Sequence, residues 1–352
     1  MESFYEVKCV LEGKILPNIM LTYRCNLRCS YCFANEFVNG SNVEISLENF
    51  KRAIEFLTIK GENIVGLIGG EPTIHPLFGQ FLKELKENEK ILRATIYTNG
   101  LKIGEFLKYL ENPKFYVLVN CNAPGIIGID NYKRMQSQLD QVYLLEDAKN
   151  RISLGINLFS NNMEYSYIFE LAKRYDVHRI RMSVTVPNLD ENKDQCSLEY
   201  LRKRKEFILK FIKECAENQI LPYYDCNSIP ECIWDDKELS EIKEIINDFG
   251  VKRTNLIGFH SFCKPVIDIL PDLRAVRCFG MSDFLKASIT EFNDVDELRD
   301  YFVNMIDSYV YHMACEKECI DCHQRQIQRC AAGWMAFVQH KLNLISEAKS
   351  GL

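Results

Sequence analysis

The stretch Cys25-Asn-Leu-Arg-Cys29-Ser-Tyr-Cys32 places three cysteines within eight residues, in the spacing C-x3-C-x2-C. It follows a short apolar run at residues 19–21, so we expect the cysteines to lie on a loop at the end of a strand. Three crowded thiolates repel one another and oxidise readily, and a thiophilic metal or an iron–sulfur cluster removes both problems. Closed zinc sites and ordinary cubane clusters take four protein ligands. Three cysteines therefore leave one metal position open for a substrate or a cofactor.

Short apolar strands alternate with helical patterns in the first two thirds of the chain. We expect strands near residues 17–23, 64–68, 94–97, 116–121, 152–159 and 179–186. This alternation predicts an α/β fold with a parallel sheet covered by helices, and ligands bind such sheets at the carboxyl ends of the strands. The cysteine loop, a Gly-Gly-Glu-Pro run at 69–72 and a Thr-Asn-Gly turn at 98–100 follow the first three strands. All three motifs are thus expected at one edge of the sheet.

At these residues the chain resembles the radical S-adenosylmethionine (radical SAM) enzymes, whose C-x3-C-x2-C signature has an aromatic residue, here Tyr31, before the third cysteine. The resemblance implies a [4Fe-4S] cluster on Cys25, Cys29 and Cys32, with SAM bound to the fourth iron. It also implies reductive cleavage of SAM to methionine and a 5'-deoxyadenosyl radical, which takes a hydrogen atom from the substrate. The implied fold is a partial (β/α)6 TIM-like barrel. The alternative for the cysteines is a zinc knuckle with a fourth ligand such as His75.

The Gly-Gly-Glu-Pro run resembles the GGEP motif of the same family. Two glycines let the backbone approach a ligand closely, and Glu71 either pairs with the ammonium group of SAM or braces the loop. A plain turn is the alternative. Asn122 stands where relatives often have a carboxylate, and an amide cannot serve as a base. The predicted cofactor contacts are Tyr31, Phe33, Gly69, Gly70, Glu71, Pro72, Asn99, Asn120 and Asn157. Arg181 either faces the active site or caps a strand, and we expect the second.

The C-terminal third is rich in cysteine. Residues 264–277 predict a hairpin with its turn at Pro271-Asp272. A hairpin with a cysteine on each arm, followed by a late C-x2-C, resembles the SPASM and twitch extensions of radical SAM enzymes, which carry one or two auxiliary [4Fe-4S] clusters. The chain departs from the SPASM pattern at Trp334, where a further cysteine is expected, and a zinc ribbon is an alternative. The implied auxiliary ligands are Cys263, Cys278, Cys319, Cys322 and Cys330.

The chain has fifteen cysteines. Their odd number and clustered spacing suit metal ligation better than a disulfide framework. Cys226, Cys232 and Cys315 are candidate catalytic hydrogen donors if they are free of metal. The chain divides into an N-terminal segment 1–16, a radical SAM core 17–222, a smaller SPASM/twitch-like α+β extension 223–340 and a C-terminal tail 341–352.

Composition argues against several other classes of protein. The net charge is −6 and no basic stripe stands out, which argues against binding to nucleic acid. No apolar run approaches the roughly 20 residues of a membrane span, and the N-terminus lacks a secretory signal. We expect a cytoplasmic protein that acts neither on nucleic acid nor in a membrane.

Relatives with this layout mostly act on peptides. The resemblance therefore implies modification of a ribosomally made peptide or protein, through a thioether or carbon–carbon crosslink, epimerisation or oxidation of a residue. The alternatives are a radical SAM dehydrogenase of a small molecule and, in another class, an iron–sulfur or zinc scaffold or electron carrier. Because the first strand begins near residue 17, we expect a separate leader-peptide-binding protein. A reductant such as flavodoxin or ferredoxin is the other expected partner.

Overall fold

The computed structural model describes residues 16–32, 38, 42–186, 196–224, 226, 228–250, 256, 263–282, 284–311, 313, 316–327 and 329–337. Within them the strands form one ten-stranded sheet in the order β10-β9-β8-β1-β2-β3-β4-β5-β6-β7. Strands β1 to β7 are parallel, and β8 runs parallel to β1. The strands are β1 (Asn18–Met20), β2 (Ile64–Ile68), β3 (Arg93–Thr98), β4 (Phe115–Asn120), β5 (Ile152–Leu158), β6 (Arg179–Val184), β7 (Leu221–Tyr224), β8 (Asp268–Ile269), β9 (Arg274–Val276) and β10 (Lys286–Ser288).

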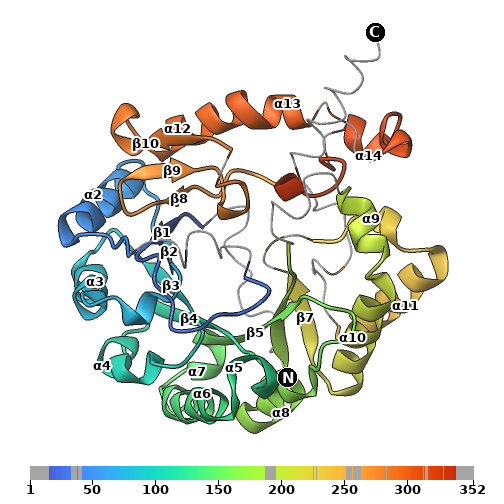
Figure 1. Cartoon of the computed structure of the whole chain (residues 1–352), viewed down its shortest axis with the longest axis horizontal. Coiled ribbons are helices and arrows are strands. Elements are labelled where there is room, and N and C mark those ends of the chain that lie inside the picture. Colours follow the sequence, from blue (N-terminus) through green and yellow to red (C-terminus); the bar gives the residue numbers. More distant parts are fainter. Residues whose placement is uncertain are drawn as a thin grey trace.

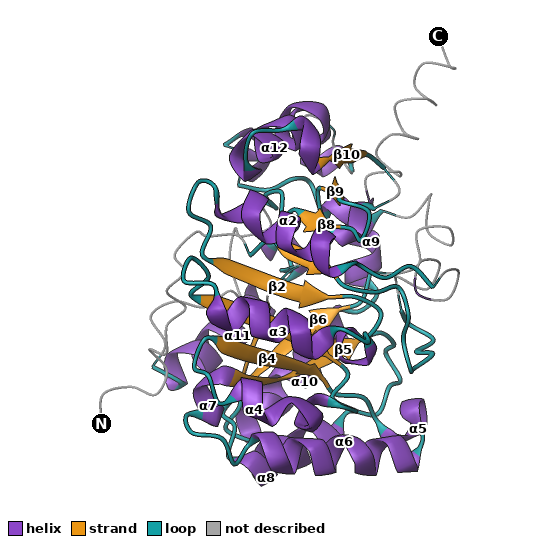
Figure 2. Cartoon of the chain, turned by 90° about the vertical axis from the view of Figure 1, so that its left-hand side faces the viewer, coloured by secondary structure: helices purple, strands orange, loops and turns teal. Residues whose placement is uncertain are grey.

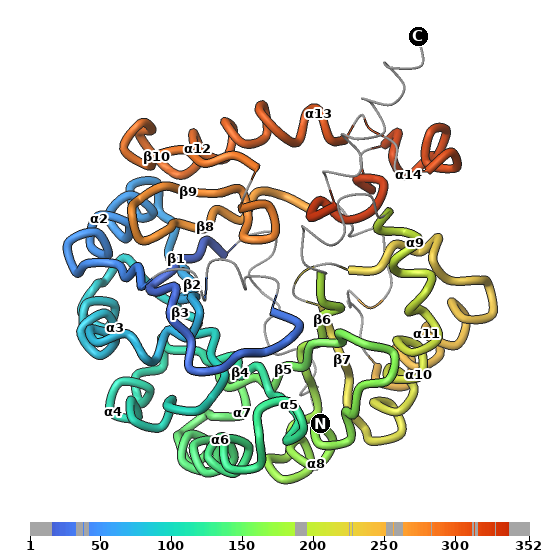
Figure 3. Tube along the Cα trace, viewed as in Figure 1, coloured from blue at the N-terminus to red at the C-terminus, as the bar shows by residue number. Residues whose placement is uncertain are grey.

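The sheet curves into an open arc with its helices on the outside (Figure 1). The colours of the tube in Figure 3 follow the arc in chain order from β1 to β7, and Figure 2 shows α3 and α4 against its outer side. The predicted α/β fold with a partial barrel is confirmed. The α-helices are α2 (Leu47–Thr58), α3 (Phe78–Glu87), α4 (Leu107–Leu110), α5 (Pro124–Ile127), α6 (Ile129–Val142), α7 (Ala148–Arg151), α8 (Ser166–Tyr175), α9 (Ser197–Arg202), α10 (Lys205–Glu217), α11 (Asp236–Asp248), α12 (Val295–Phe302), α13 (Ser308–Val310) and α14 (His323–Gln326).

The two faces of the sheet differ in polarity because side chains alternate along each strand. In β5, Leu154 and Ile156 are fully buried in the main core, while Ser153 and Asn157 are only partly buried on the other face. The amphipathic helices supply the opposing half of that core; α2, for example, begins at Ser46, whose Oγ accepts the N–H of Asn49 at 3.0 Å. The outer layer is therefore apolar, and the inner face of the arc remains available for polar groups.

The predicted positions of β1 to β6 are confirmed, but the prediction that the strand pattern stops there is wrong. Strand β7 follows α10 and pairs with β6. Its sequence, Leu-Pro-Tyr-Tyr, contains Pro222, which normally excludes a strand except at a sheet edge, and β7 is such an edge. Two helices, α9 and α10, precede β7, and α6 ends at Val142.

The predicted hairpin between Cys263 and Cys278 is confirmed, since β8 and β9 pair in antiparallel fashion. At the turn Leu273 adopts a φ of +66°, and the N–H of Leu270 donates to the carbonyl of Arg274 at 2.7 Å. The hairpin extends the main sheet through β1, where Asn18 Nδ2 donates to Asp268 Oδ1 at 2.6 Å. The cysteine-rich segment is thereby joined to the strand that carries the first cysteine loop. In the described part of the chain no helix has the length and apolar character needed to cross a membrane.

Candidate active site

The three cysteines of the first motif lie on the loop that leaves the carboxyl end of β1. Cys25, Cys29 and Cys32 are each partly buried. A turn brings the last two together, with the N–H of Cys32 donating to the carbonyl of Cys29 at 3.1 Å. The N–H of Leu27 points at Cys25 Sγ over 3.4 Å. The loop therefore already offers a backbone donor to one of the sulfurs that the sequence predicts as ligands.

The Gly-Gly-Glu-Pro run holds this loop from the end of the neighbouring strand β2. The N–H of Gly70 donates to the carbonyl of Thr22, and the N–H of Glu71 to the carbonyl of Arg24, each at 2.8 Å. A Cβ at Gly70 would lie 2.2 Å from the Arg24 oxygen, and one at Gly69 would lie 2.7 Å from the Thr22 oxygen. The two glycines thus permit the close approach of two backbones, and the Gly70 amide is already used within the protein.

Glu71 is buried beneath this contact, with only 1% of its surface exposed. Its Oε1 accepts the N–H and the hydroxyl of Thr73, at 3.1 and 2.6 Å, and the hydroxyl of Thr98 at 2.7 Å. Its Oε2 accepts the N–H of Asn99 at 2.7 Å. Burial raises the pKa of Glu71, and these hydrogen bonds counteract the rise. The geometry favours the bracing alternative for Glu71, since the carboxylate joins the ends of β2 and β3.

Asn99 completes the connection to the cysteine loop. Its Nδ2 donates to Asn26 Oδ1, between the first two cysteines, at 2.7 Å, and its own Oδ1 accepts the N–H of Leu101 at 3.1 Å. The sequence analysis singled out Asn99 but gave no role to Asn26. The only sequence signal for Asn26 is its place within the cysteine motif, and its partner comes from a strand 70 residues further along.

Tyr31 joins the cysteine loop to residues that follow β4 and β5. Its ring stacks on Phe159, with centroids 4.6 Å apart and planes inclined by 11°. Its hydroxyl donates to Asn122 Oδ1, just beyond β4. Burial raises the pKa of Tyr31, so the phenol stays protonated and able to donate. Asn122 thus acts as an acceptor that positions the loop, in keeping with its unsuitability as a base.

A polar row lies on the inner face of β4, β5 and β6. Arg181 Nη1 donates to Asn157 Oδ1 at 2.7 Å and more weakly to Asn120 Oδ1 at 3.4 Å. Gly155 pairs with both Asn120 and Arg181 in the sheet, and a Cβ there would lie 3.4 Å from Arg181 Cδ. The expectation that Arg181 caps a strand is wrong, because its side chain lies along the inner face. Alternation within β6 is the signal that could have placed it there.

The electrostatics of the cysteine loop favour a bound cation. Burial raises the pKa of Cys25 to about 11, and the negative charges of Glu71, Cys29 and Cys32 act in the same direction. Burial and the charge of Cys32 also raise the pKa of Cys29. Three soft thiolate donors around a cationic centre would remove this repulsion. The donor set therefore fits an iron–sulfur cluster with one open iron.

The zinc alternative lacks the fourth ligand that the sequence suggested. His75 is buried, its Nδ1 accepts the N–H of Leu77 at 3.0 Å, and its ring packs on Phe81 with centroids 4.8 Å apart. Across the described residues, no three Cys, His, Asp or Glu side chains converge on a point that a single metal ion could occupy. A cubane cluster requires a wider arrangement, because each thiolate binds a different iron.

The C-terminal cysteines fall into two groups. In the hairpin group, burial raises the pKa of Cys278 to about 12, and the charge of Cys263 adds to the rise. In the second group, burial raises the pKa of Cys232 to about 11, and the sulfurs of Cys330, Cys319 and Cys322 add to it. Cys232, which the sequence suggests as a hydrogen donor, thus feels the charges of three predicted ligands.

A hydrogen bond and an ion pair join the segments that carry the second group. Cys232 lies in the short helix η5 (Glu231–Ile233), and Cys319 ends η9 (Lys317–Cys319). Trp334 Nε1 donates to the carbonyl of Ser228 at 3.0 Å, which ties the chain after Cys330 to the chain before Cys232. Nearby, Arg202 forms a bidentate ion pair with Glu316, at 2.8 and 2.7 Å. Of the remaining predicted site residues, Cys226 is exposed, and Cys315 and Phe33 lie outside the described residues.

Comparisons with known proteins place these motifs in a family. Residues 19–159 match the model of the radical SAM superfamily. The chain is 37% identical over 149 residues to the 7,8-dihydro-6-hydroxymethylpterin dimethyltransferase of Methanocaldococcus jannaschii, covering 42% of this chain and 27% of that protein. It is 30% identical over 147 residues to a GTP 3',8-cyclase of Clostridium perfringens, covering 40% and 44%. It is 25% identical over 150 residues to the subtilosin biosynthesis protein AlbA of Bacillus subtilis, covering 41% and 33%. The matched segments span less than half of each of these relatives.

The fold extends the similarity beyond that segment. Streptococcus suis SuiB bound to S-adenosylmethionine superposes with a TM-score of 0.60 at 16% sequence identity, covering 94% of this chain and 74% of SuiB. SuiB bound to its precursor peptide SuiA gives a TM-score of 0.59 over the same share of this chain. At this level of identity the similarity establishes the fold. The match to the radical SAM superfamily rests on the family model over residues 19–159.

Gly70→Ala tests whether the glycine run positions the cysteine loop. The new Cβ meets the Arg24 carbonyl, so we expect a folded protein that loses about four irons per chain after anaerobic reconstitution. Gly125→Ala is the matched control, because a Cβ there meets nothing within 4 Å. Iron and sulfide assays, with circular dichroism for folding, make the comparison. Equal iron in both variants would mean that the loop does not depend on this contact.

Proposed function

We propose, from the radical SAM domain formed by residues 19–159, that this chain is a radical SAM enzyme that removes a hydrogen atom from a peptide or protein substrate. The observation that carries the proposal is the triad of partly buried thiols at the carboxyl end of β1, braced by residues 69–71 and 99. An electron carrier or a zinc scaffold has no use for three ligands that leave a metal position open.

The residues divide into ligands and positioning groups. Cys25, Cys29 and Cys32 would hold a [4Fe-4S] cluster whose fourth iron binds S-adenosylmethionine. The chemistry that this pair supplies, with one electron from a reductant such as flavodoxin or ferredoxin, is cleavage of S-adenosylmethionine to methionine and a 5'-deoxyadenosyl radical. The protein fixes the loop from three sides, through Glu71, Asn99 and Tyr31. The inner-face row of Asn120, Asn157 and Arg181 offers polar contacts for bound cofactor or substrate.

We further propose two auxiliary iron–sulfur clusters. One uses Cys263 and Cys278 of the hairpin, and the other uses Cys232 together with Cys319, Cys322 and Cys330. Because they would stand beside an S-adenosylmethionine cluster, where a substrate radical needs an electron acceptor, iron–sulfur clusters are favoured here over zinc ions. Cys232 then serves as a ligand, and Cys226 or Cys315 remains the candidate hydrogen donor.

The peptide substrate is supported by the extent of the similarity. SuiB is described as bound to its precursor peptide, and its fold covers 94% of this chain, including the cysteine-rich C-terminal part. AlbA is named for biosynthesis of the bacteriocin subtilosin. Auxiliary clusters would give a substrate radical an electron acceptor, which crosslinking and oxidation of a residue both need. A separate leader-peptide-binding protein is the proposed partner.

A small-molecule substrate is the second candidate. Two of the curated relatives with 30% identity or more are named for a pterin and for GTP. These matches cover about 40% of this chain, so the similarity to the two enzymes is limited to part of it. Incubation with candidate peptides and with GTP, followed by mass spectrometry, distinguishes the two classes.

Replacing Cys25, Cys29 and Cys32 together by Ala tests the core of the proposal. The variant should form no 5'-deoxyadenosine from S-adenosylmethionine under dithionite, because the open cluster site is gone. It should still bind iron in the C-terminal part. Chromatography of the nucleoside and an iron assay measure both effects. Deoxyadenosine at the wild-type level would refute the assignment of this loop.

Cys232→Ser tests the second auxiliary site. If Cys232 is a ligand, the variant should lose part of its iron and absorbance near 400 nm while still binding S-adenosylmethionine. Cys121→Ala is the control, since Cys121 is buried and its Sγ donates to the carbonyl of Val119 at 3.4 Å. Unchanged iron and absorbance in Cys232→Ser would return Cys232 to the list of hydrogen donors.

A further inference from the structure

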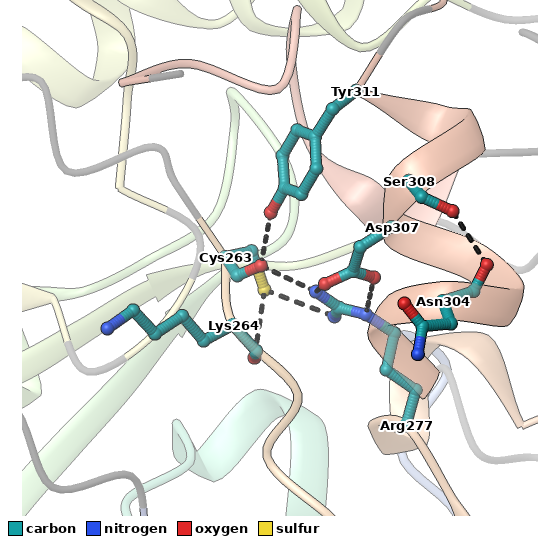
Figure 4. Close-up of polar contacts among 7 residues, drawn as sticks. All are labelled: Cys263, Lys264, Arg277, Asn304, Asp307, Ser308 and Tyr311. Carbon is teal, nitrogen blue, oxygen red and sulfur yellow. Dashed lines mark hydrogen bonds and ion pairs between the residues drawn. The ribbon is translucent and has the colours of Figure 1, made fainter. Parts of the chain in front are cut away.

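Arg277 is a fully buried cation directly before Cys278 in the sequence. It follows β9 and forms an ion pair with Asp307, of which only 2% is exposed. Asp307 is the last residue of the π-helical segment η8 (Val303–Asp307), and Ser308 Oγ caps that turn by donating to the carbonyl of Asn304 at 2.6 Å. Figure 4 shows the guanidinium between Asp307 and Cys263. The pair thus connects the outer helix layer to the hairpin cysteines.

The guanidinium of Arg277 contacts Asp307 along one side and Cys263 along another. Nε and Nη2 donate to the two carboxylate oxygens of Asp307, the second at 2.9 Å, so the planar group is held in one orientation. In that orientation Nη1 points at Cys263 Sγ over 3.5 Å, and Nη2 also donates to the Cys263 carbonyl. The Tyr311 hydroxyl donates to the same carbonyl (Figure 4). Three polar groups therefore converge on one cysteine.

Stability alone is a poor explanation for this arrangement. Taking two charges out of water costs several kcal/mol per ion, and replacing a buried ion pair by apolar residues is often neutral or stabilising. A fully buried pair that directs its free N–H at a sulfur points to a role at that sulfur. We propose that Arg277, oriented by Asp307, is a positioning residue that donates to Cys263 Sγ and raises the reduction potential of the iron–sulfur cluster held by Cys263 and Cys278.

A donor to Cys263 Sγ would raise the reduction potential because the charge of the cluster changes on reduction. An added electron increases the negative charge on the ligand sulfurs, so a donor to sulfur stabilises the reduced cluster more than the oxidised one. Asp307 cancels the net charge of the guanidinium, and the effect is therefore local to the hydrogen bond. A cluster that is easier to reduce is a better acceptor for an electron from a substrate radical.

The inference rests on the proposed auxiliary cluster, and the experiment separates the two. The full-length chain with Cys25, Cys29 and Cys32 replaced by Ala serves as the parent, so that only auxiliary signals remain. The signal of interest is the electron paramagnetic resonance signal that Cys263→Ala removes. If the parent has no such signal, the auxiliary-cluster proposal fails before Arg277 is tested.

In this parent, Arg277→Met combined with Asp307→Leu removes the donor without leaving an unpaired buried charge. We expect the iron content to be retained and the midpoint potential of the signal to fall. The control pair is Arg299→Met with Glu62→Leu, which removes another ion pair (2.7 Å), formed between α12 and the turn before β2. A potential that stays at the parent value in the double variant, with iron retained, would overturn the inference.

Arg277→Lys provides a second variant in case the double replacement does not fold. It keeps a cation to pair with Asp307 but lacks the planar group that directs a further N–H at Cys263 Sγ, so we expect the midpoint potential to fall with the iron retained. A role limited to bracing the chain predicts a potential at the parent value, and that result would contradict the role of Arg277.

Discussion

The structure depends on one close contact, in which the backbone of Gly70 and Glu71 lies against the backbone of residues 22–24. Two hydrogen bonds of 2.8 Å form there, and a side chain at Gly70 would exclude them. Beneath the contact, the buried Glu71 carboxylate accepts four hydrogen bonds from the ends of β2 and β3. These contacts hold the first cysteine loop against the ends of β2 and β3. Preorganisation of this kind lowers the entropy lost on binding a cofactor.

The C-terminal part is joined to the first cysteine loop through the sheet. Strand β8 pairs with β1, so the hairpin that carries Cys263 and Cys278 is continuous with the strand that leads to Cys25. Trp334 and the Arg202–Glu316 pair fasten the last cysteine segment to η5 and α9. The proposed auxiliary clusters therefore belong to the same rigid frame as the proposed S-adenosylmethionine site. Electron transfer between such centres needs fixed separation, which a common sheet provides.

Local patterns in the sequence were enough for the first six strands, the cysteine loop and the hairpin, because each follows from spacing, periodicity or turn residues. Contacts between distant segments were not predictable in this way. The pairing of Asn26 with Asn99 and of Arg181 with Asn157 depends on which strands are neighbours. Strand β7 could not be predicted because it contains Pro222. Proline is tolerated only in an edge strand, and which strand lies at the edge depends on the final strand order. The grouping proposed for Cys232 with Cys319, Cys322 and Cys330 likewise depends on the fold, through contacts such as that of Trp334 with Ser228.

The most direct test of the account is the electron paramagnetic resonance spectrum of the anaerobically prepared, dithionite-reduced protein, recorded with its iron and sulfide content before and after addition of S-adenosylmethionine. An open-site cluster with auxiliary clusters predicts roughly eight to twelve irons per chain and a signal that changes when S-adenosylmethionine binds. Protein without iron, or a spectrum that S-adenosylmethionine leaves unchanged, would contradict the assignment of Cys25, Cys29 and Cys32 as the centre of the active site.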